Sequence, residues 1–201
     1  MDTGIEKTLK ALKKNKIEAV FYERSSEAVT ALLTEIAPDQ TVGIGGSVTV
    51  KSLELPEKLL ERGNQVFFHW LNPEKSSEIR RNALKADIYL SSTNALTEEG
   101  QLVNIDGVGN RVVGMIYGPK KVFIICGINK IVGNLDEAIQ HIKSNTYKNA
   151  RRLNLKTPCA VTGNCNDCDS PQRMCSVTTI IHRKPAETEL KVILIGEELG
   201  Y

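Results

Sequence analysis

The chain has 201 residues, of which 41% are hydrophobic and 25% are charged, and its formal net charge is +2. This composition is typical of a soluble globular protein with one sizeable core, so we expect residues 1–201 to form a single domain. So small a net charge argues against nucleic-acid binding, and no apolar run is long enough to cross a membrane. We find no secretory segment and expect a cytoplasmic protein.

The first half of the chain alternates between helical and strand patterns. Strands are predicted over residues 17–22, 41–44, 65–70 and 88–91. Helices are predicted over 3–15, 25–37, 48–62 and 73–86. Ser25, Ser47 and Asn72 are the expected helix caps, and Pro56 is expected to interrupt the third helix.

The second half continues this alternation. Residues 121–127 form a continuous apolar run, as expected of a strand covered on both faces. Thr97–Gly100 resembles a β-turn, and Asn134 begins a capping-box pattern before another helix. Strands over 177–182 and 191–195 are joined by a polar turn around Pro185. The sequence therefore predicts an α/β fold, with a mostly parallel sheet and helices on both faces.

Four of the five cysteines are spaced as Cys-x5-Cys-x2-Cys-x6-Cys near the C-terminal end. The intervening residues are mostly turn formers, which cannot build a core but let the backbone wrap around a ligand. We therefore expect a cysteine-rich loop segment over residues 157–176 that binds a metal ion or cluster. The predicted ligands are Cys159, Cys165, Cys168 and Cys175.

Three interpretations of these thiols compete: a metal site, disulfides and unrelated free cysteines. A cytoplasmic location disfavours disulfides, and thiolates are soft ligands that suit zinc or iron. Structural zinc sites usually have two close cysteine pairs, whereas here only Cys165 and Cys168 form one. The spacing therefore favours an iron–sulfur cluster of the 4Fe–4S type, with zinc as the alternative.

A glycine-rich loop follows the predicted strand over residues 41–44. Its glycines allow backbone amides to approach a ligand, and the helix that begins there favours an anion. The loop matches neither a Walker motif nor the full dinucleotide-binding spacing, and a tight turn alone is the alternative. The candidate anion-binding residues are Gly45, Gly46, Ser47 and Thr49.

A second polar loop, Asn104–Arg111, follows another expected strand and holds more polar groups than a turn needs. Asp106 is a candidate general base, and Arg111 is a candidate bidentate clamp for a carboxylate or phosphate. Asn104, Asn110, Ser92 and Asn94 could add amide and hydroxyl groups to the same pocket. The alternative is an ordinary Asp-Gly turn with Asn110 in a left-handed conformation.

Residues 86–132, read with the GIGGS loop and the terminal GEELGY, resemble the LUD (lactate utilisation) domain family. The likeness spans essentially the whole chain and is greatest to the branch with a cysteine-rich C-terminal segment. It implies the fold of the NagB/RpiA/CoA-transferase-like superfamily, whose members bind sugar phosphates, CoA thioesters or folates near the strand ends. It also implies a part in oxidising lactate to pyruvate beside iron–sulfur partner proteins.

Three functions follow as hypotheses. In the first, the pocket binds a small anionic metabolite such as lactate, and the cysteines hold a cluster that relays electrons. In the second, the protein is an isomerase- or transferase-like enzyme for a phosphorylated or CoA-linked substrate, with structural zinc. In the third, it is a non-enzymatic metabolite-binding partner. The sequence decides neither the oligomeric state nor whether the chain is itself catalytic.

Overall fold

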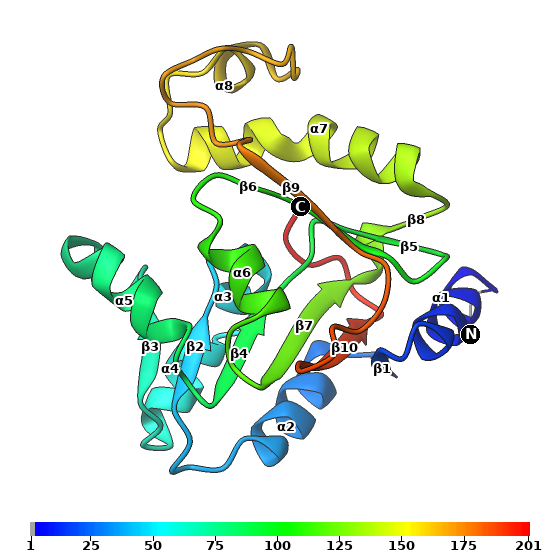
Figure 1. Cartoon of the computed structure of the whole chain (residues 1–201), viewed down its shortest axis with the longest axis vertical. Coiled ribbons are helices and arrows are strands. Elements are labelled where there is room, and N and C mark those ends of the chain that lie inside the picture. Colours follow the sequence, from blue (N-terminus) through cyan, green and yellow to red (C-terminus); the bar gives the residue numbers. More distant parts are fainter. Residues whose placement is uncertain (1–2) are drawn as a thin grey trace.

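A computed structural model describes residues 3–201, and its centre is a six-stranded sheet (Figure 1). The strand order is β1-β10-β7-β4-β2-β3, and every neighbouring pair is parallel. The strands are β1 (Glu18–Tyr22), β2 (Val42–Ile44), β3 (Val66–Phe68), β4 (Ile88–Ser91), β7 (Lys121–Gly127) and β10 (Glu189–Ile195). The prediction of an α/β fold with a mostly parallel sheet is confirmed.

Helices and a second layer cover the two faces of this sheet. One face packs against α2 (Ser25–Glu35), α3 (Val48–Ser52) and α4 (Leu55–Glu61). The other packs against α1 (Thr3–Lys14), α5 (Ser76–Ala83) and α6 (Asn110–Ile116). In β7, Phe123 and Ile125 belong to the first core while Val122, Ile124 and Cys126 belong to the second. This alternation explains the unbroken apolar run, because a strand points successive side chains to opposite faces.

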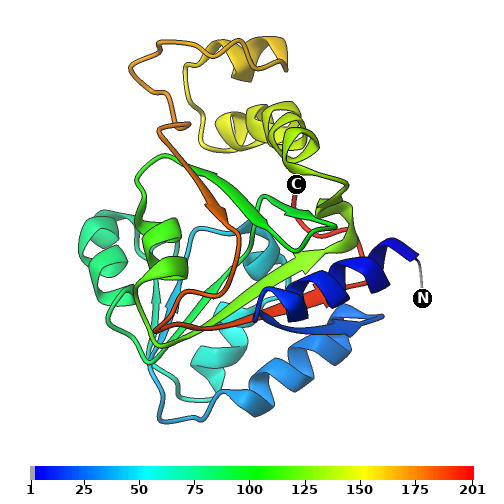
Figure 2. The same ribbon diagram turned by 45° about the vertical axis from the view of Figure 1, so that its right-hand side comes forward.

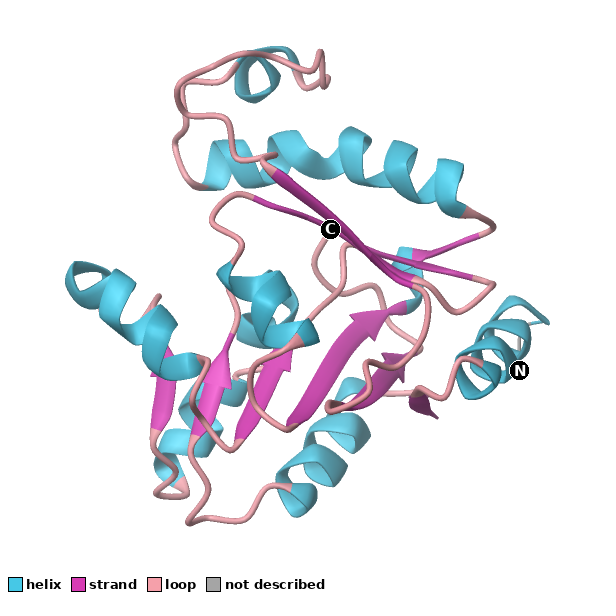
Figure 3. Cartoon of the chain, viewed as in Figure 1, coloured by secondary structure: helices cyan, strands magenta, loops and turns pink. Residues whose placement is uncertain are grey.

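A four-stranded second sheet, which we did not predict, lies beyond the carboxyl ends of the large one (Figure 3). It contains β5 (Ala95–Thr97), β6 (Leu102–Asp106), β8 (Ile131–Val132) and β9 (Val177–Ile181). The long helix α7 (Leu135–Arg152) packs on it through Ala138 and Ile142, which contact Ala95 and Val103 in a third core. This layer places α7 above the strand ends, where the predicted loops emerge.

The strand and helix predictions differ from the structure at several points. Ser25 is the first residue of α2 rather than its cap, which is Arg24 without a capping hydrogen bond. Ser47, Asn72 and Asn134 do accept capping hydrogen bonds, although Asn72 begins a short 3-10 helix, η1 (Pro73–Lys75), before α5. The two last strands lie in different sheets, because β9 pairs with β6 whereas β10 inserts between β1 and β7.

The cysteine segment projects beyond α7 as a loop with one short helix, α8 (Pro158–Thr162) (Figure 2). Arg151 holds α8 to α7 by donating hydrogen bonds to the carbonyl oxygens of Ala160 (2.7 Å) and Val161 (3.3 Å). At the other end, the Ser176 amide donates to the carbonyl oxygen of Asp106 at 3.0 Å. The segment is therefore tied to the end of β6, beside the second polar loop.

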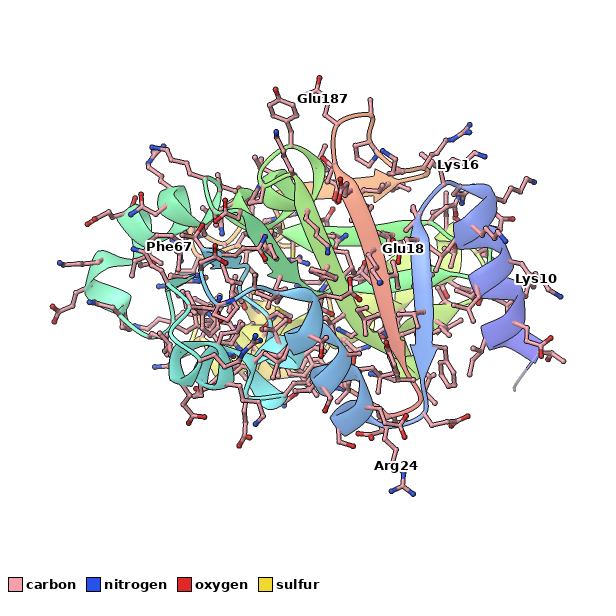
Figure 4. The ribbon with its side chains drawn as sticks, turned by 90° about the horizontal axis from the view of Figure 1, so that it is seen from below. Lys10, Lys16, Glu18, Arg24, Phe67 and Glu187 are labelled. Carbon is pink, nitrogen blue, oxygen red and sulfur yellow. The ribbon has the colours of Figure 1, made fainter. Side chains whose placement is uncertain are left out.

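The exterior carries charged side chains of both signs, and Lys10, Arg24 and Glu187 point away from the body (Figure 4). Within the described residues, no helix is both long and apolar enough to cross a membrane.

Candidate functional site

A pocket of about 520 Å³ lies at the carboxyl ends of the large sheet, where residues of α7 and of the end of β6 also line it. In parallel sheets the loops after the strands meet at this edge and form the ligand crevice. The pocket brings together the glycine loop, the Ser92–Asn94 turn and the Asp106 loop. All the residues predicted for it line it except Gly45 and Asn104, which lie behind Arg111.

The glycine loop passes close to larger side chains, and this explains its composition. A Cβ atom on Gly45 would lie about 3.0 Å from Arg111 Cγ and from the Tyr89 hydroxyl. A Cβ atom on Gly46 would lie 3.3 Å from a ring carbon of His69. Ser47 Oγ accepts a hydrogen bond from the Val50 amide at 3.2 Å, so it caps α3 while it lines the pocket. These contacts account for both glycines as packing positions.

Arg111 is buried and is the centre of the polar network between the loops. Its Nε donates to Asp106 Oδ2 at 2.9 Å. Its four remaining N–H groups donate to the Ser92 carbonyl, Asn104 Oδ1, Asn94 Oδ1 and the Ile105 carbonyl, at 3.2, 2.7, 2.9 and 2.9 Å. All five guanidinium donors therefore have protein acceptors. A bidentate clamp on a ligand would require Arg111 to release some of them.

Asp106 is similarly occupied. Its Oδ1 accepts hydrogen bonds from the amides of Val108 (3.1 Å) and Gly109 (2.6 Å), and its Oδ2 accepts from Arg111. Gly109 takes the left-handed conformation (φ 87°), and Asn110 begins α6. This geometry fits a residue that shapes the loop, and the catalytic roles of Asp106 and Arg111 stay predictions.

Lys130, which we did not single out in the sequence, lies buried in the pocket wall just after β7. Its Nζ donates hydrogen bonds to Thr49 Oγ1 (3.1 Å), Ser92 Oγ (2.9 Å) and the Thr93 carbonyl (3.1 Å). All three acceptors are neutral, and among residues 3–201 no carboxylate forms an ion pair with this ammonium group. Burial lowers the pKa of Lys130 to about 8.

Four further residues complete the opposite side of the pocket: His69, Trp70, Arg80 and Arg152. The Arg152 guanidinium lies 4.4 Å from the centre of the Trp70 ring. His69 is buried, and its burial together with Arg80 and Arg152 lowers its pKa to about 4, so it is neutral near pH 7. Of the charged side chains that line the pocket, four are cationic and one, Asp106, is anionic and paired with Arg111. The pocket therefore favours an anion.

A separate cavity of about 270 Å³ is lined by all four cysteines of the C-terminal segment, together with Lys143 and Arg173. Cys159 is buried, Cys165 is exposed, and Cys168 and Cys175 are half-buried. Burial raises the pKa of the Cys175 thiol, and the three other cysteines act in the same direction. No three His, Cys, Asp or Glu side chains between Thr3 and Tyr201 are grouped as a site for a single metal ion.

A small gap of about 30 Å³ lies between this cysteine cavity and the pocket at the strand ends. Met174 lines the pocket and the gap, whereas its neighbour Cys175 lines the gap and the cysteine cavity. Met174 and Cys175, which are adjacent in the chain, therefore lie between the two cavities, one lining each.

Sequence reasoning missed Lys130 because it lies in the apolar stretch CGINKIV, where one lysine has no motif around it. Its position directly after a buried strand was the available signal, since that is where the pocket loops begin. Arg80 and Arg152 had no such signal. They come from helices, and only the packing of α5 and α7 brings them to the strand ends.

Comparisons with known proteins give one family and one fold. The family model of the LUD domain matches residues 5–195. The structure resembles the crystal structure of a DUF162 family protein from Deinococcus radiodurans, with a TM-score of 0.56, 11% sequence identity and 96% of each chain covered. No curated protein sequence matches this chain.

Proposed function

The chain belongs to the LUD domain family, which supports a lactate-utilisation-related role, and we propose that it binds a small anionic metabolite and carries an iron–sulfur cluster. The metabolite site is the pocket at the strand ends, and the cluster ligands are the four cysteines that line the second cavity. Oxidation of lactate to pyruvate releases two electrons and two protons; the cluster would carry the electrons one at a time to iron–sulfur partner proteins, and the protons would pass to solvent.

The observation that carries the metabolite site is the buried ammonium group of Lys130. A buried charge is costly unless an opposite charge accompanies it, and this one has only neutral protein partners. A ligand carboxylate in the pocket would provide the missing charge. Thr49 and Ser92 hold the ammonium in place, and the Leu199 carbonyl accepts a hydrogen bond from Thr49 Oγ1 at 3.3 Å. The terminal residues thereby help to cover this end of the pocket.

The lining of the cysteine cavity supports the proposal of a cluster. Four sulfur-bearing side chains line one space of about 270 Å³, and thiolates are the ordinary ligands of iron–sulfur clusters. Arg173 shapes this loop, because it donates hydrogen bonds to the carbonyl oxygens of Cys168 (2.7 Å) and Cys175 (3.0 Å). A bound cluster would supply one-electron transfer. Met174 lines the pocket and its chain neighbour Cys175 lines the cysteine cavity. The short distance along the chain supports electron transfer between a metabolite and a cluster bound there.

The metabolite site is tested by titrating the protein with lactate and with pyruvate in a calorimeter. Lys130→Met should weaken binding at least about tenfold, because the ligand loses the buried pocket cation that has no carboxylate partner among the described residues. Lys10→Met is the matched control, since Lys10 is exposed on α1 and points into solvent (Figure 4). If the Lys130→Met variant and the parent bound the acids with equal affinity, Lys130 would have no role in binding, and the proposed site would lose its main support.

The cluster is tested by measuring iron, zinc and acid-labile sulfide in protein purified without oxygen. Iron and sulfide should be present in the parent and absent after Cys165→Ser with Cys168→Ser. Cys126→Ala is the control, because Cys126 is buried in β7 and does not line the cysteine cavity. Zinc in place of iron would contradict the electron-transfer role and favour the isomerase- or transferase-like alternative with a structural zinc site.

A further inference from the structure

The metabolite pocket has a second cationic end that lactate would leave unused. Lys130, just after β7, is buried, whereas Arg80 of α5 is half-buried and Arg152 of α7 is exposed. Lactate carries one carboxylate and can neutralise only one of these ends. A volume of about 520 Å³ also lies in the range of pockets for larger, drug-sized ligands.

Arg80 gives the most specific evidence for a second anionic group. Its Nε is buried and has no hydrogen-bond partner among the described residues. A buried N–H group without an acceptor is costly, and cationic donors cost more than neutral ones. Arg80 and Ser76 are one helical turn apart on α5, and both line the pocket. Arg80 therefore lies on the pocket-facing side of that helix and keeps one donor that no described residue satisfies.

Arg152 approaches the same place from α7. It lies over the Trp70 ring and donates hydrogen bonds to Asn149 Oδ1 (3.1 Å) and the Tyr201 hydroxyl oxygen (3.2 Å), all of them neutral partners. His69, which both arginines influence, is neutral near pH 7 and so does not balance their charge. Two guanidinium groups thus lie around one neutral histidine, with no carboxylate of the described chain paired to either.

We propose that the pocket also accepts a small carboxylic acid that carries a phosphate group, and that Arg80 and Arg152 bind this phosphate. Guanidinium groups match the oxygen geometry of phosphate, and two of them offset its double charge. The inference rests on the proposed function, since it assigns the carboxylate of the same ligand to the Lys130 end. It adds a phosphate subsite formed by Arg80, Arg152 and Trp70.

The test compares two acids that differ only in the phosphate, glycerate and 3-phosphoglycerate, by calorimetric titration. 3-Phosphoglycerate should bind about 10-fold to 100-fold more tightly than glycerate, because its phosphate gains charge-assisted hydrogen bonds. Arg80→Met and Arg152→Met should each remove most of this preference, because each should weaken 3-phosphoglycerate binding far more than glycerate binding. Arg81→Met is the matched control, since Arg81 is the exposed neighbour of Arg80 and does not line the pocket.

Equal affinity for the two acids, or a preference that survives Arg80→Met, would overturn the phosphate subsite and leave the proposed function intact. Lys130→Met separates the two ideas, because it should weaken both acids equally without changing their ratio. If neither acid binds, titration of the parent and of the two arginine variants with inorganic phosphate tests the subsite by itself. Phosphate binding that requires Arg80 and Arg152 would keep the subsite and remove the carboxylic acid, whereas no phosphate binding would overturn both.

Discussion

At the level of single residues, Arg111 and Lys130 are both buried cations of one pocket, but their surroundings differ. Arg111 has a carboxylate and four neutral acceptors for its five donors, so its charge and its hydrogen bonds are satisfied within the protein. Lys130 has its hydrogen bonds but no opposite charge. We therefore propose that Arg111 positions the Ser92–Asn94 turn against the end of β6 and that Lys130 contacts the ligand.

This assignment predicts that Arg111→Lys lowers the free energy of unfolding by about 2–4 kcal/mol, because lysine keeps the charge but offers fewer donors in a different geometry. Urea denaturation measures the change. Arg81→Lys, at an exposed site, should stay within about 0.5 kcal/mol of the parent. An Arg111→Lys variant as stable as the parent but unable to bind the metabolite would instead make Arg111 a ligand-binding residue.

Lys130 predicts a dependence of stability on pH. Its pKa is about 8 in the folded chain against an ordinary value of 10.5, and burial is the main cause. Between these values the unfolded chain holds a proton that the folded chain has released, so the free energy of unfolding rises with pH. Below pH 8 both states are protonated, and the cost of the buried charge is fully present.

Lys130→Met should therefore be more stable than the parent below pH 8, by up to roughly 3 kcal/mol, and the difference should vanish towards pH 10.5. Urea denaturation of both proteins across this range measures it. Lys10→Met again controls for the loss of one lysine. A constant difference at all pH values would show that Lys130 keeps an ordinary pKa in the folded chain.

At the level of elements, the contact between β2 and α5 sets the position of Arg80. A Cβ atom on Gly43 in β2 would overlap the backbone carbonyl of Ala83, the last residue of α5. Glycine thus lets the helix backbone lie directly against the strand. Arg80 is one turn earlier in α5, so the depth of this packing decides how far its guanidinium reaches into the pocket.

Gly43→Ala should consequently lower the free energy of unfolding by about 1–3 kcal/mol, because the clash involves backbone rather than a movable side chain. It should also reduce the preference for 3-phosphoglycerate over glycerate. Gly4→Ala is the control, since among the described residues its Cβ would meet a flexible Glu98 carboxylate oxygen at 3.3 Å, in the first turn of α1. Unchanged stability would mean that α5 moves away at little cost.

At the level of the whole molecule, the cysteine segment lies outside the cores that hold the rest of the chain together. Of residues 157–176, only Thr157 and Cys159 are buried, and α8 is held to α7 mainly through Arg151. A region with so few buried contacts opens locally at low free energy. Ligation of its four thiols would add the constraint that packing does not provide.

Hydrogen exchange should show this difference directly. In metal-free protein the amides of residues 163–173 should exchange much faster than those of β7 and β10, and cluster loading should slow only the former. The double variant Cys165→Ser, Cys168→Ser should not respond to loading. Exchange that is equally slow before and after loading would mean that the segment is ordered without a metal.

The sequence alone determined much of the local structure. It predicted the strand over 121–127, the caps at Ser47 and Asn134 and the close spacing of the cysteines, because each depends on residues that are near one another in the chain. It also indicated which loops would meet, since parallel strands bring their carboxyl ends to one edge. Only the tertiary structure decided that Lys130, Arg80 and Arg152 share this pocket and that β9 and β10 lie in different sheets. These arrangements depend on contacts between distant segments, and neither periodicity nor spacing records such contacts.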